Sequence, residues 1–217
     1  GVTVDRQCGS SQQAVHFAAA GLVAGHYDIV IAGGTEVMSM IPMGSPAGTY
    51  DCFGPAYMQR FGVAPNQGEG AEMIAQKWGL TRRAMDEFGL ESHRRAAEAQ
   101  DKGEFDAQIV PITLPDGTVF DRDECIRRGS TIEDLSGIRP AFRPDGLISA
   151  GNASQISDGA SALLMMTEEK AAELGLAPMA AVHTAALGGA DPVMMLTAPI
   201  PATQKAIKRS GLALDDI

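Results

Sequence analysis

The amino-acid sequence predicts an α/β fold, and three features of its N-terminal part carry that prediction. Residues 1–7 alternate between apolar and polar side chains, as a short strand does. Residues 10–24 are typical of a helix, and the apolar run at residues 28–36, "DIVIAGGTE", is typical of an interior parallel strand. A strand, a helix and a strand in this order form a βαβ unit, whose crossover is expected to be right-handed.

The helix expected over residues 10–24 is apolar on nearly every side, and most of its apolar side chains are small. A helix of this kind is usually buried rather than amphipathic. Gly25 is a suitable residue to end it. We therefore expect neighbouring elements to enclose this helix.

Residues 40–150 have a different character. The Gly- and Pro-rich stretch at residues 39–68 is expected to be irregular. Helices are expected from about Gly70 to Trp78 and, behind a capping Thr81, up to Gly103.

The rest of this region is expected to hold a strand and a "DG" turn in residues 105–124, followed by loop up to residue 155. A connection of this length is too long for a simple loop. We interpret it as an inserted subdomain and as a place for ligand contacts.

The strand and helix pattern returns near the C-terminus. We expect a buried strand and a short helix in "DGASALLMMTEEKAAELG", an apolar strand at residues 179–190, and a helix at residues 199–211. The sequence starts without Met at an apparent strand and ends just after an apparent helix. We therefore expect it to be a piece of a longer protein.

Composition excludes several functional classes. Of the 217 residues, 45% are hydrophobic and 20% charged, which is typical of a globular protein with a sizeable core. The net charge of -10 argues against nucleic acid as a partner, because binding phosphates needs a broad basic surface. No apolar stretch approaches the roughly 20 residues of a membrane span, and no secretory signal is visible.

The three cysteines, Cys8, Cys52 and Cys125, are widely spaced and form no C-x-x-C motif. This pattern argues against a disulfide framework and against a zinc ribbon. We therefore expect no metal site and a reducing, cytoplasmic location.

Cys8 lies where the first expected strand meets the first expected helix. Unpaired N–H groups and the dipole at a helix N-terminus favour a thiolate and can hold an oxyanion during acyl transfer. The alternative is a cysteine that only packs in the core, which is common. A metal-binding role is disfavoured because no second ligand stands at helical or turn spacing. Position alone leaves Cys8 as either a packing residue or a nucleophile.

Several segments resemble thiolases, the acyl-CoA:acetyl-CoA acyltransferases. Residues 4–39 hold a C-G-S turn leading into a helix and a G-G-x-E-x-M-S strand end, in "VDRQCGSSQQAVHFAAAGLVAGHYDIVIAGGTEVMS". Residues 147–166, "LISAGNASQISDGASALLMM", resemble a second family signature, with Gln155 and Ser157 where the family usually has Gly and Asn. "DECIRRGST" and "IRPAF" are similar to the family's loop domain. The resemblance covers the whole chain and implies that Cys8 is the nucleophile.

The resemblance implies a thiolase-like layered αβαβα fold of two similar halves, incomplete in this chain. Residues 1–39 and 150–175 would belong to the N-terminal half, which holds the nucleophile helix. Residues 40–149 would form the inserted loop domain that covers coenzyme A. Residues 176–217 would begin the C-terminal half.

The resemblance also implies a reaction. Cys8 would attack a 3-ketoacyl-CoA, release acetyl-CoA and keep the shortened acyl group as a thioester for transfer to a second coenzyme A, or run the reverse Claisen condensation. The enzyme class would be an acetyl-CoA C-acyltransferase or acetyltransferase of lipid metabolism, as in fatty acid β-oxidation. Coenzyme A would be a substrate, with no resident cofactor.

Of three further family motifs, G-H-P and N-E-A-F do not occur in the sequence, and C-x-G occurs only at residues 52–54, within the expected loop domain. We expect them after Ile217, so that this chain holds half of an active site and is inactive alone. Cys52 and Cys125 do not match the family's second cysteine. The available histidines are interpreted as structural or solvated: His16, His26, His93 and His183.

Contacts to coenzyme A are implied for four residues. Arg127 matches the family arginine near the nucleotide, where a guanidinium can bond phosphate and stack on adenine. Ser154 matches a serine near the pantetheine, Ala150 a neighbouring position, and Phe142 a loop-domain phenylalanine. Many biosynthetic thiolases have a His-Met pair at the positions that match Asn66 and Gln67 of this chain, and this departure favours a degradative enzyme.

Two alternatives stay open. One is a condensing enzyme of the same fold, similar to ketosynthases, although the G-G-T-E-x-M-S and G-N-A-S segments argue against it. The other is a non-catalytic coenzyme-A-binding or dimerisation piece. The family usually forms homodimers or homotetramers, and the sequence leaves open the oligomeric state, the acyl chain length and the direction of the reaction.

Overall fold

The structure is a computed structural model that describes residues 1–45, 48–49, 51 and 53–217. The chain divides into two compact units. The first unit comprises Gly1–Cys52, Ile156–Gly189 and Ala198–Ile217. The second unit comprises Phe53–Gln155 and Ala190–Thr197. The four-part domain division expected from the thiolase resemblance stays a prediction.

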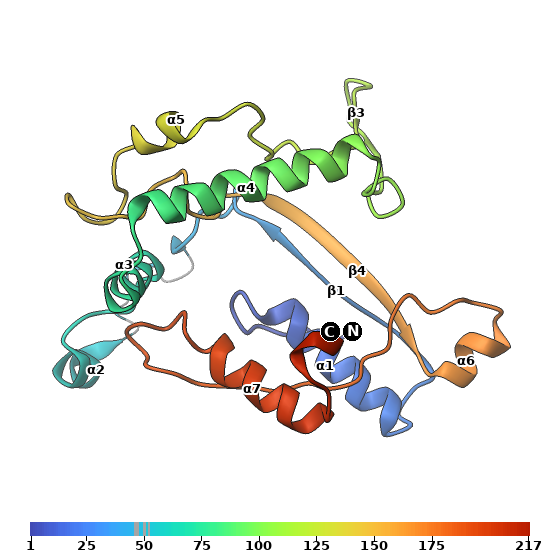
Figure 1. Ribbon diagram of the computed structural model, residues 1–217. Helices are drawn as coiled ribbons and strands as arrows, with labels where there is room; N and C mark the ends of the chain where they lie inside the picture. The colour runs from blue at the N-terminus through green and yellow to red at the C-terminus, as the bar shows by residue number, and fades with distance from the viewer. Residues whose placement is uncertain (46–47, 50, 52) are drawn as a thin grey trace. The chain divides into compact units, whose positions relative to one another are not determined.

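The first unit is built on a two-stranded antiparallel ribbon (Figure 1). The ribbon pairs β1 (Ile29–Val37) with β4 (Asp158–Met166), in register from Ile29 opposite Met166 to Val37 opposite Asp158. Helix α1 (Ser10–Val23) packs against β1. The other elements of this unit are α6 (Glu168–Glu173), α7 (Pro199–Ser210) and the 3₁₀ helix η2 (Leu214–Asp216).

Helix α1 confirms the helix expected over residues 10–24. Gly25 ends it in a left-handed conformation, at φ 71°, and its N–H donates to the carbonyl of Leu22. The face toward the ribbon buries Ala18, Gly21 and Leu22. The expectation that the helix is enclosed on every side is wrong, because Val23 is 91% exposed and no described residue covers it.

The prediction of a strand is wrong for two segments. Residues 1–7 and 179–190 form no strand, and Arg6 makes only an isolated bridge with Cys8. A strand needs a neighbour to bond its backbone N–H and C=O groups, and no described strand lies beside either segment. The predicted βαβ unit therefore does not form.

The interior parallel strand expected at residues 28–36 is also corrected. It forms as β1, but its partner β4 runs antiparallel. The strand expected to be buried at β4 is largely exposed, with Leu163 at 55% and Leu164 at 60%. Helix α1 packs mainly against β1 and touches β4 little, so apolar side chains on both faces of β4 stay accessible in the described residues.

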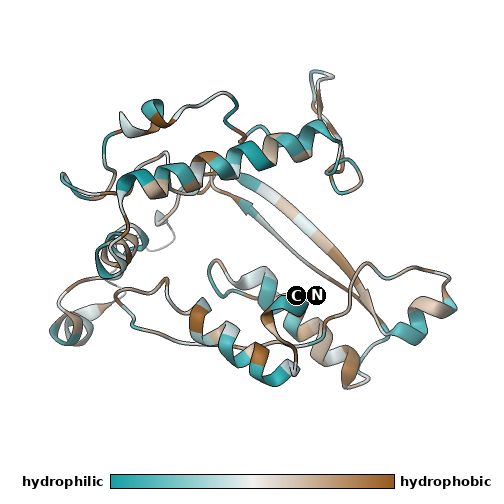
Figure 2. Ribbon diagram, viewed as in Figure 1, coloured by the Kyte–Doolittle hydropathy of each residue, from teal (hydrophilic) through white to brown (hydrophobic). Residues whose placement is uncertain are grey.

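The second unit is mainly helical. Its elements are α2 (Gly54–Phe61), α3 (Gln67–Trp78), α4 (Arg82–Asp101), β2 (Ile112–Thr113), β3 (Val119–Phe120) and α5 (Ile132–Ser136). Helices α3 and α4 confirm the two helices expected there, and Thr81 caps α4 by accepting the N–H of Ala84. Figure 2 shows α4 as mainly hydrophilic, with isolated hydrophobic positions.

The strand and turn expected in residues 105–124 form a short hairpin of β2 and β3. Gly117 takes the left-handed conformation that the turn requires, at φ 85°. Leu114 and Thr118 close the turn by a backbone hydrogen bond of 2.8 Å. The "DG" turn is therefore confirmed.

Two short helices lie in stretches expected to be irregular. Helix α2 forms where Pro55 stands at its first turn and three aromatic rings, Phe53, Tyr57 and Phe61, line up at centroid distances of 5.2 and 4.6 Å. Helix α5 begins with a capping box in which Thr131 and Asp134 bond each other's backbone N–H groups. Local ring packing and capping thus form helices where composition predicted loops.

Within the described residues, no helix combines the length and the apolar character that a membrane crossing requires. The same residues hold no group of three or more His, Cys, Asp or Glu side chains placed to bind a metal ion.

Candidate active site

Cys8 lies in a tight turn immediately before α1, and its residue is exposed. Gln7 adopts a left-handed conformation at φ 51°, which is uncommon for a residue other than glycine. The N–H of Gly9 donates to the carbonyl of Arg6 at 3.0 Å, and the N–H of Ser10 donates to the carbonyl of Gln7 at 3.1 Å. Together these features present Cys8 at the start of the helix.

Side chains reinforce this turn. The Ser10 hydroxyl accepts the N–H of Arg6 at 2.7 Å and donates to the carbonyl of Gln7 at 2.6 Å. The Arg6 guanidinium donates to the Gln13 side chain at 2.9 Å, one turn further along α1. The turn that carries Cys8 is therefore held by residues close to it in the sequence.

The start of α1 suits negative charge. Its first turn holds no acidic residue, and no side chain caps its N-terminal N–H groups. Such N–H groups and the helix dipole stabilise a thiolate or an oxyanion.

The glycine pair of the G-G-T-E-x-M-S motif allows close packing around this turn. A methyl group on Gly34 would overlap the Ser11 hydroxyl in the first turn of α1. A methyl group on Gly33 would lie 2.6 Å from the carbonyl oxygen of Ser161 in β4. The pair lets β1 approach both the cysteine helix and its partner strand.

A polar tie joins the ends of the two family signatures. The carboxylate of Asp158 accepts the backbone N–H of Ser39 at 2.9 Å and also the Ser39 hydroxyl. The Ser39 hydroxyl, and then its N–H, lower the pKa of Asp158 below its ordinary value. Ser39 and Asp158 are 119 residues apart in the sequence, so this tie fixes the register of the ribbon.

Ala150 and Ser154 lie on an exposed segment of the second unit. Buried polar groups hold the backbone just before it. The carboxylate of Glu72, which is 4% exposed, accepts the N–H groups of Leu147 and Ile148, all at 2.9 Å. A buried carboxylate with several N–H donors is well satisfied, so this contact fixes the start of the segment.

A second buried cluster holds the middle of the segment. Asp86 is fully buried and accepts the Arg82 guanidinium at 2.7 and 2.9 Å and the Asn152 side-chain amide at 2.8 Å. Asn152 also accepts the N–H of the fully buried Ser149. Gly89 in α4 comes so close that a methyl group there would lie 2.6 Å from the Gly151 carbonyl oxygen. The segment is therefore fastened to α4.

Phe142 is 44% exposed and its ring covers Gly68, where any side chain would overlap it. Ala141, beside it, donates its N–H to the carbonyl of Ile148 at 2.8 Å. Phe142 thus lies on a stretch that is bonded to the segment of Ala150.

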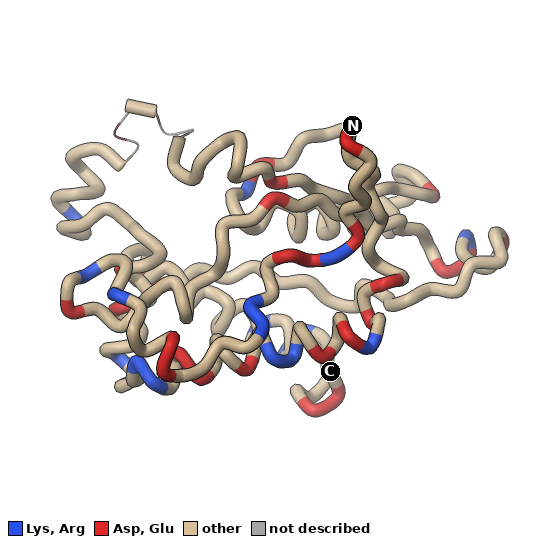
Figure 3. The backbone as a smooth tube through the Cα atoms, turned by 90° about the horizontal axis from the view of Figure 1, so that it is seen from above, with Lys and Arg blue, Asp and Glu red and all other residues tan. Residues whose placement is uncertain are grey.

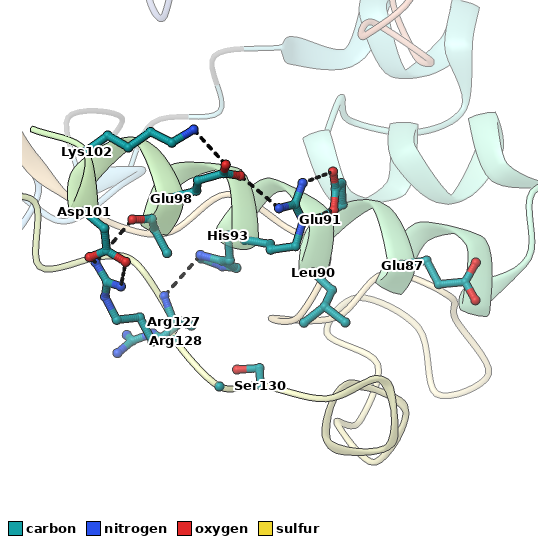
Figure 4. Close-up of a pocket in the computed structure, with 13 residues that line it drawn as sticks. Glu87, Leu90, Glu91, His93, Glu98, Asp101, Lys102, Arg127, Arg128 and Ser130 are labelled. Carbon is teal, nitrogen blue, oxygen red and sulfur yellow. Dashed lines mark hydrogen bonds and ion pairs between the residues drawn. The ribbon is translucent and has the colours of Figure 1, made fainter. Parts of the chain in front are cut away.

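Arg127 and Arg128 line a groove of about 780 Å³ that runs along α4 (Figure 4). Salt bridges line the groove: Arg94 lies 2.6 Å from Glu91 and 3.0 Å from Glu98. Arg94, followed by Arg95, lowers the pKa of Glu91 to about 2. Arg127 is exposed, and its guanidinium has no recorded hydrogen bond or ion pair among the described residues.

Arg127 belongs to a chain whose net charge is negative. The sequence holds 27 acidic and 17 basic residues, and the two kinds are interspersed along the backbone (Figure 3). A chain of this charge attracts anions only locally. An arginine with an unengaged guanidinium is such a local position.

His93 has a contact that the sequence did not predict: its Nδ1 accepts the backbone N–H of Arg127 at 3.2 Å. His183 Nδ1 lies 2.7 Å from the Thr184 hydroxyl. His16 lines a small hollow with Lys205 and Arg209, and His26 donates its backbone N–H to the carbonyl of Gly21.

Asn66 caps α3, because its side chain accepts the N–H groups of Gly68 and Glu69. Gln67 is the first residue of that helix. Cys125 is half-buried, and Cys52 lies outside the described residues.

The structure gathers the four residues expected to contact coenzyme A, Arg127, Phe142, Ala150 and Ser154, in the second unit, whereas Cys8 belongs to the first. Sequence reasoning missed the residues that support them: Glu72, Arg82, Asp86 and Asn152. The only sequence signal for these was the spacing of Arg82 and Asp86, one helical turn apart.

Comparison with known proteins identifies the family. A family profile described as "Thiolase, N-terminal domain" matches residues 1–169. A 3-ketoacyl-CoA thiolase of Saccharophagus degradans is 44% identical over 99% of this chain, which covers 56% of that protein. A steroid 3-ketoacyl-CoA thiolase of Mycobacterium tuberculosis is 42% identical over the whole chain, which covers 55% of it. The chain thus spans little more than half the length of these relatives.

Two solved structures support the same family assignment. The acetyl-CoA acetyltransferase of Bacillus anthracis matches the whole chain with a TM-score of 0.86 and 38% identity, over 58% of that structure's chain. The enzyme of the same name from Syntrophomonas wolfei matches with the same TM-score and 32% identity. The expected fold class, an incomplete thiolase-like α/β fold, is confirmed. By sequence and by fold, this chain belongs to the thiolase family.

Proposed function

We propose that the complete protein transfers acyl groups to and from coenzyme A, with Cys8 as the nucleophile. The observation that carries the proposal is the exposed turn in which Cys8 precedes the uncapped N-terminus of α1. Similarity to proteins named 3-ketoacyl-CoA thiolase and acetyl-CoA acetyltransferase supports the same chemistry. The proposed substrate is a 3-ketoacyl-CoA.

In the first half of the reaction, the Cys8 thiolate attacks the C3 carbonyl carbon of the substrate. The C2–C3 bond then breaks, its electron pair stays on C2, and a proton added there yields acetyl-CoA. The acyl group remains on Cys8 as a thioester, which divides one difficult displacement into two easier ones.

In the second half, the thiol of a second coenzyme A gives up its proton and attacks the thioester carbonyl. The carbon–Sγ bond breaks, an acyl-CoA two carbons shorter leaves, and the Cys8 thiolate is restored. The reverse sequence is a Claisen condensation. The N–H groups at the start of α1 stabilise negative charge that develops beside Cys8.

The second unit supplies the proposed contacts to coenzyme A. Arg127 binds the nucleotide end, where an unengaged guanidinium suits phosphate. Ser154, Ala150 and Phe142 bind along the pantetheine. The buried bonds of Glu72 and Asp86 keep that segment in place without contacting the ligand.

Groups other than Cys8 carry out the proton transfers. The thiolase resemblance assigns them to a histidine in G-H-P, which does not occur in this sequence, and to a cysteine in C-x-G, whose only occurrence, at residues 52–54, lies in the expected loop domain. We propose that the 217 residues alone show no turnover. A homodimer or homotetramer, a cytoplasmic location and a role in β-oxidation are proposed on the same resemblance.

The proposal is tested by alkylation and mutation of the full-length protein. Iodoacetamide near neutral pH should label Cys8 selectively, and acetoacetyl-CoA should protect it. Cys8→Ser should abolish thiolysis of acetoacetyl-CoA and leave binding of coenzyme A, measured by calorimetry, largely intact. Cys125→Ser is the matched control and should keep turnover.

Two results would contradict the nucleophile assignment. One is turnover by Cys8→Ser at the wild-type rate. The other is equal labelling of Cys8 and Cys125 with no protection by substrate. Binding without any turnover by the wild-type protein would instead support a non-catalytic coenzyme-A-binding role.

A further inference from the structure

We propose that Gln155 and His93 are positioning residues that hold Arg127 in the orientation that binds the nucleotide end of coenzyme A. The proposal rests on the proposed function and names two residues beyond the four coenzyme contacts. Neither residue is expected to touch the ligand. Both act on the backbone of the loop at residues 125–130, which carries Arg127.

The two adjacent arginines of this loop have different roles. The Arg128 guanidinium donates to both carboxylate oxygens of Asp101 at 2.9 Å (Figure 4). It also donates to the Gln100 side chain at 2.8 Å. Asp101 raises the pKa of Arg128, and Arg128 lowers that of Asp101. The Arg128 guanidinium is therefore bonded to α4. The Arg127 guanidinium makes no hydrogen bond or ion pair within the described part of the chain.

The backbone around Arg127 is fastened from two sides. The Gln155 side-chain amide donates to the carbonyl of Cys125 at 2.5 Å. On the other side, His93 Nδ1 accepts the N–H of Arg127 itself at 3.2 Å, as Figure 4 shows. These bonds leave the Arg127 side chain unengaged while fixing the peptide groups before and at its own position.

Gln155 joins the two stretches that carry the proposed coenzyme contacts. It immediately follows Ser154, and its side chain is bonded to the loop of Arg127. This bond helps to set the distance between the serine position and the arginine position, together with the bonds that fasten both stretches to α4. A ligand that spans both positions binds best when this distance is preset.

This tie is a property of this chain rather than of the family signature. Thiolases usually have Gly at the position of Gln155, and glycine has no side chain to donate. His93 lies on α4 and is half-buried. The Gln155 tether thus sets this chain apart from the usual family signature.

The test compares a substrate that has the nucleotide with one that lacks it, in the full-length protein. Gln155→Met keeps the length of the side chain and removes the donor. It should raise KM for acetoacetyl-CoA about fivefold, the effect of one ordinary hydrogen bond, with little change in kcat. It should leave kcat/KM for acetoacetyl-pantetheine unchanged. Gln108→Met is the matched control, since Gln108 also bonds a backbone carbonyl, that of Glu104.

A double mutant shows whether Gln155 acts through Arg127. Arg127→Ala should raise KM for acetoacetyl-CoA, and adding Gln155→Met to it should raise KM no further. Equal effects of Gln155→Met with and without Arg127 would overturn the proposal. So would an equal loss with acetoacetyl-pantetheine, which would indicate general damage to the fold.

His93 is tested by removal and rescue of its acceptor. His93→Leu should raise KM for acetoacetyl-CoA, whereas His93→Asn, whose side-chain oxygen can replace Nδ1 as an acceptor, should restore most of the affinity. Failure of His93→Asn to differ from His93→Leu would contradict the role of this bond. If wild-type protein neither binds coenzyme A nor turns over substrate, the proposed function fails instead, which these variants do not decide.

Discussion

The two units hold their functional segments in different ways. In the first unit, the turn of Cys8 is fixed by neighbours such as Ser10 and Gln13, and large apolar side chains of α1 and β4 remain exposed. In the second unit, the segment of Ala150 and Ser154 is fixed by buried carboxylates from distant helices. A nucleophile needs one orientation at a helix end, which local contacts supply. A long ligand needs several positions held apart, which only long-range contacts supply.

The largest expected effect is the loss of Asp86. Asp86→Ala removes the partner of the Arg82 guanidinium and of Asn152, and leaves a mostly buried charge uncompensated. We expect a loss of about 3–5 kcal/mol in the free energy of unfolding. Urea unfolding followed by circular dichroism measures it. Glu87→Ala, at the next position of α4, is the control, and an equal loss in both would argue against the buried cluster.

The next effect concerns the ribbon of the first unit. Gly33→Ala places a methyl group 2.6 Å from the Ser161 carbonyl, and the backbone cannot move away cheaply. We expect a cost of about 1–3 kcal/mol in stability. Gly159→Ala, in the partner strand, meets no atom within 4 Å and serves as the control. Thermal melting should separate the two variants, and matching melting temperatures would contradict the close approach of the strands.

A smaller effect on stability is expected to depend on pH. Because Ser39 lowers the pKa of Asp158, the folded state binds this proton less readily than the unfolded state. The tie therefore stabilises the fold above the ordinary carboxyl pKa of about 4, and its contribution is lost as the pH falls through the lower folded value. Ser39→Ala should be less stable than wild type near neutral pH and should lose less on acidification.

Melting temperatures measured from about pH 6 to pH 2 test this sign, since the two curves should converge at the acid end. Ser45→Ala is the control, because the Ser45 hydroxyl donates only to the carbonyl of Pro42. A constant difference between Ser39→Ala and wild type over the whole range would mean that Asp158 is not the group involved.

The smallest effect is expected at an exposed ion pair of the second unit. Arg83 and Glu87 lie 2.8 Å apart on α4, and their side chains are 72% and 53% exposed. Solvent and salt screen such pairs. Arg83→Ala should leave the melting temperature unchanged within error, in contrast to Arg82→Ala at the preceding position. A large loss from Arg83→Ala would erase the distinction between buried and exposed pairs.

Sequence signals that act locally predicted local structure. The Thr81 cap, the "DG" turn and the glycines after α1 and α7 marked elements that the structure contains. The family resemblance predicted the fold class, because its motifs stand in order along the whole chain. The position of Cys8 before a helix followed from the same pattern.

Features that depend on distant partners were not predictable. Whether residues 1–7 form a strand depends on a neighbouring strand, which one segment of sequence does not reveal. The burial of Glu72 and Asp86 has no sequence signal, since nothing nearby in the sequence shows that residues 147–152 bond to them. Likewise, only the path of α4 beside the loop distinguishes the engaged Arg128 from Arg127.

The antiparallel pairing of β1 with β4 sets an order of events during synthesis. Its two strands are separated by the entire α2–α5 region, and the Ser39–Asp158 tie spans 119 residues. Contacts so distant form late, because the intervening chain must first be ordered. On a ribosome, helices α3 and α4 emerge and fold while β1 is still without a partner. Strand β1 therefore has no partner until β4 has emerged, and the stage with an unpaired β1 edge is the one most exposed to misfolding.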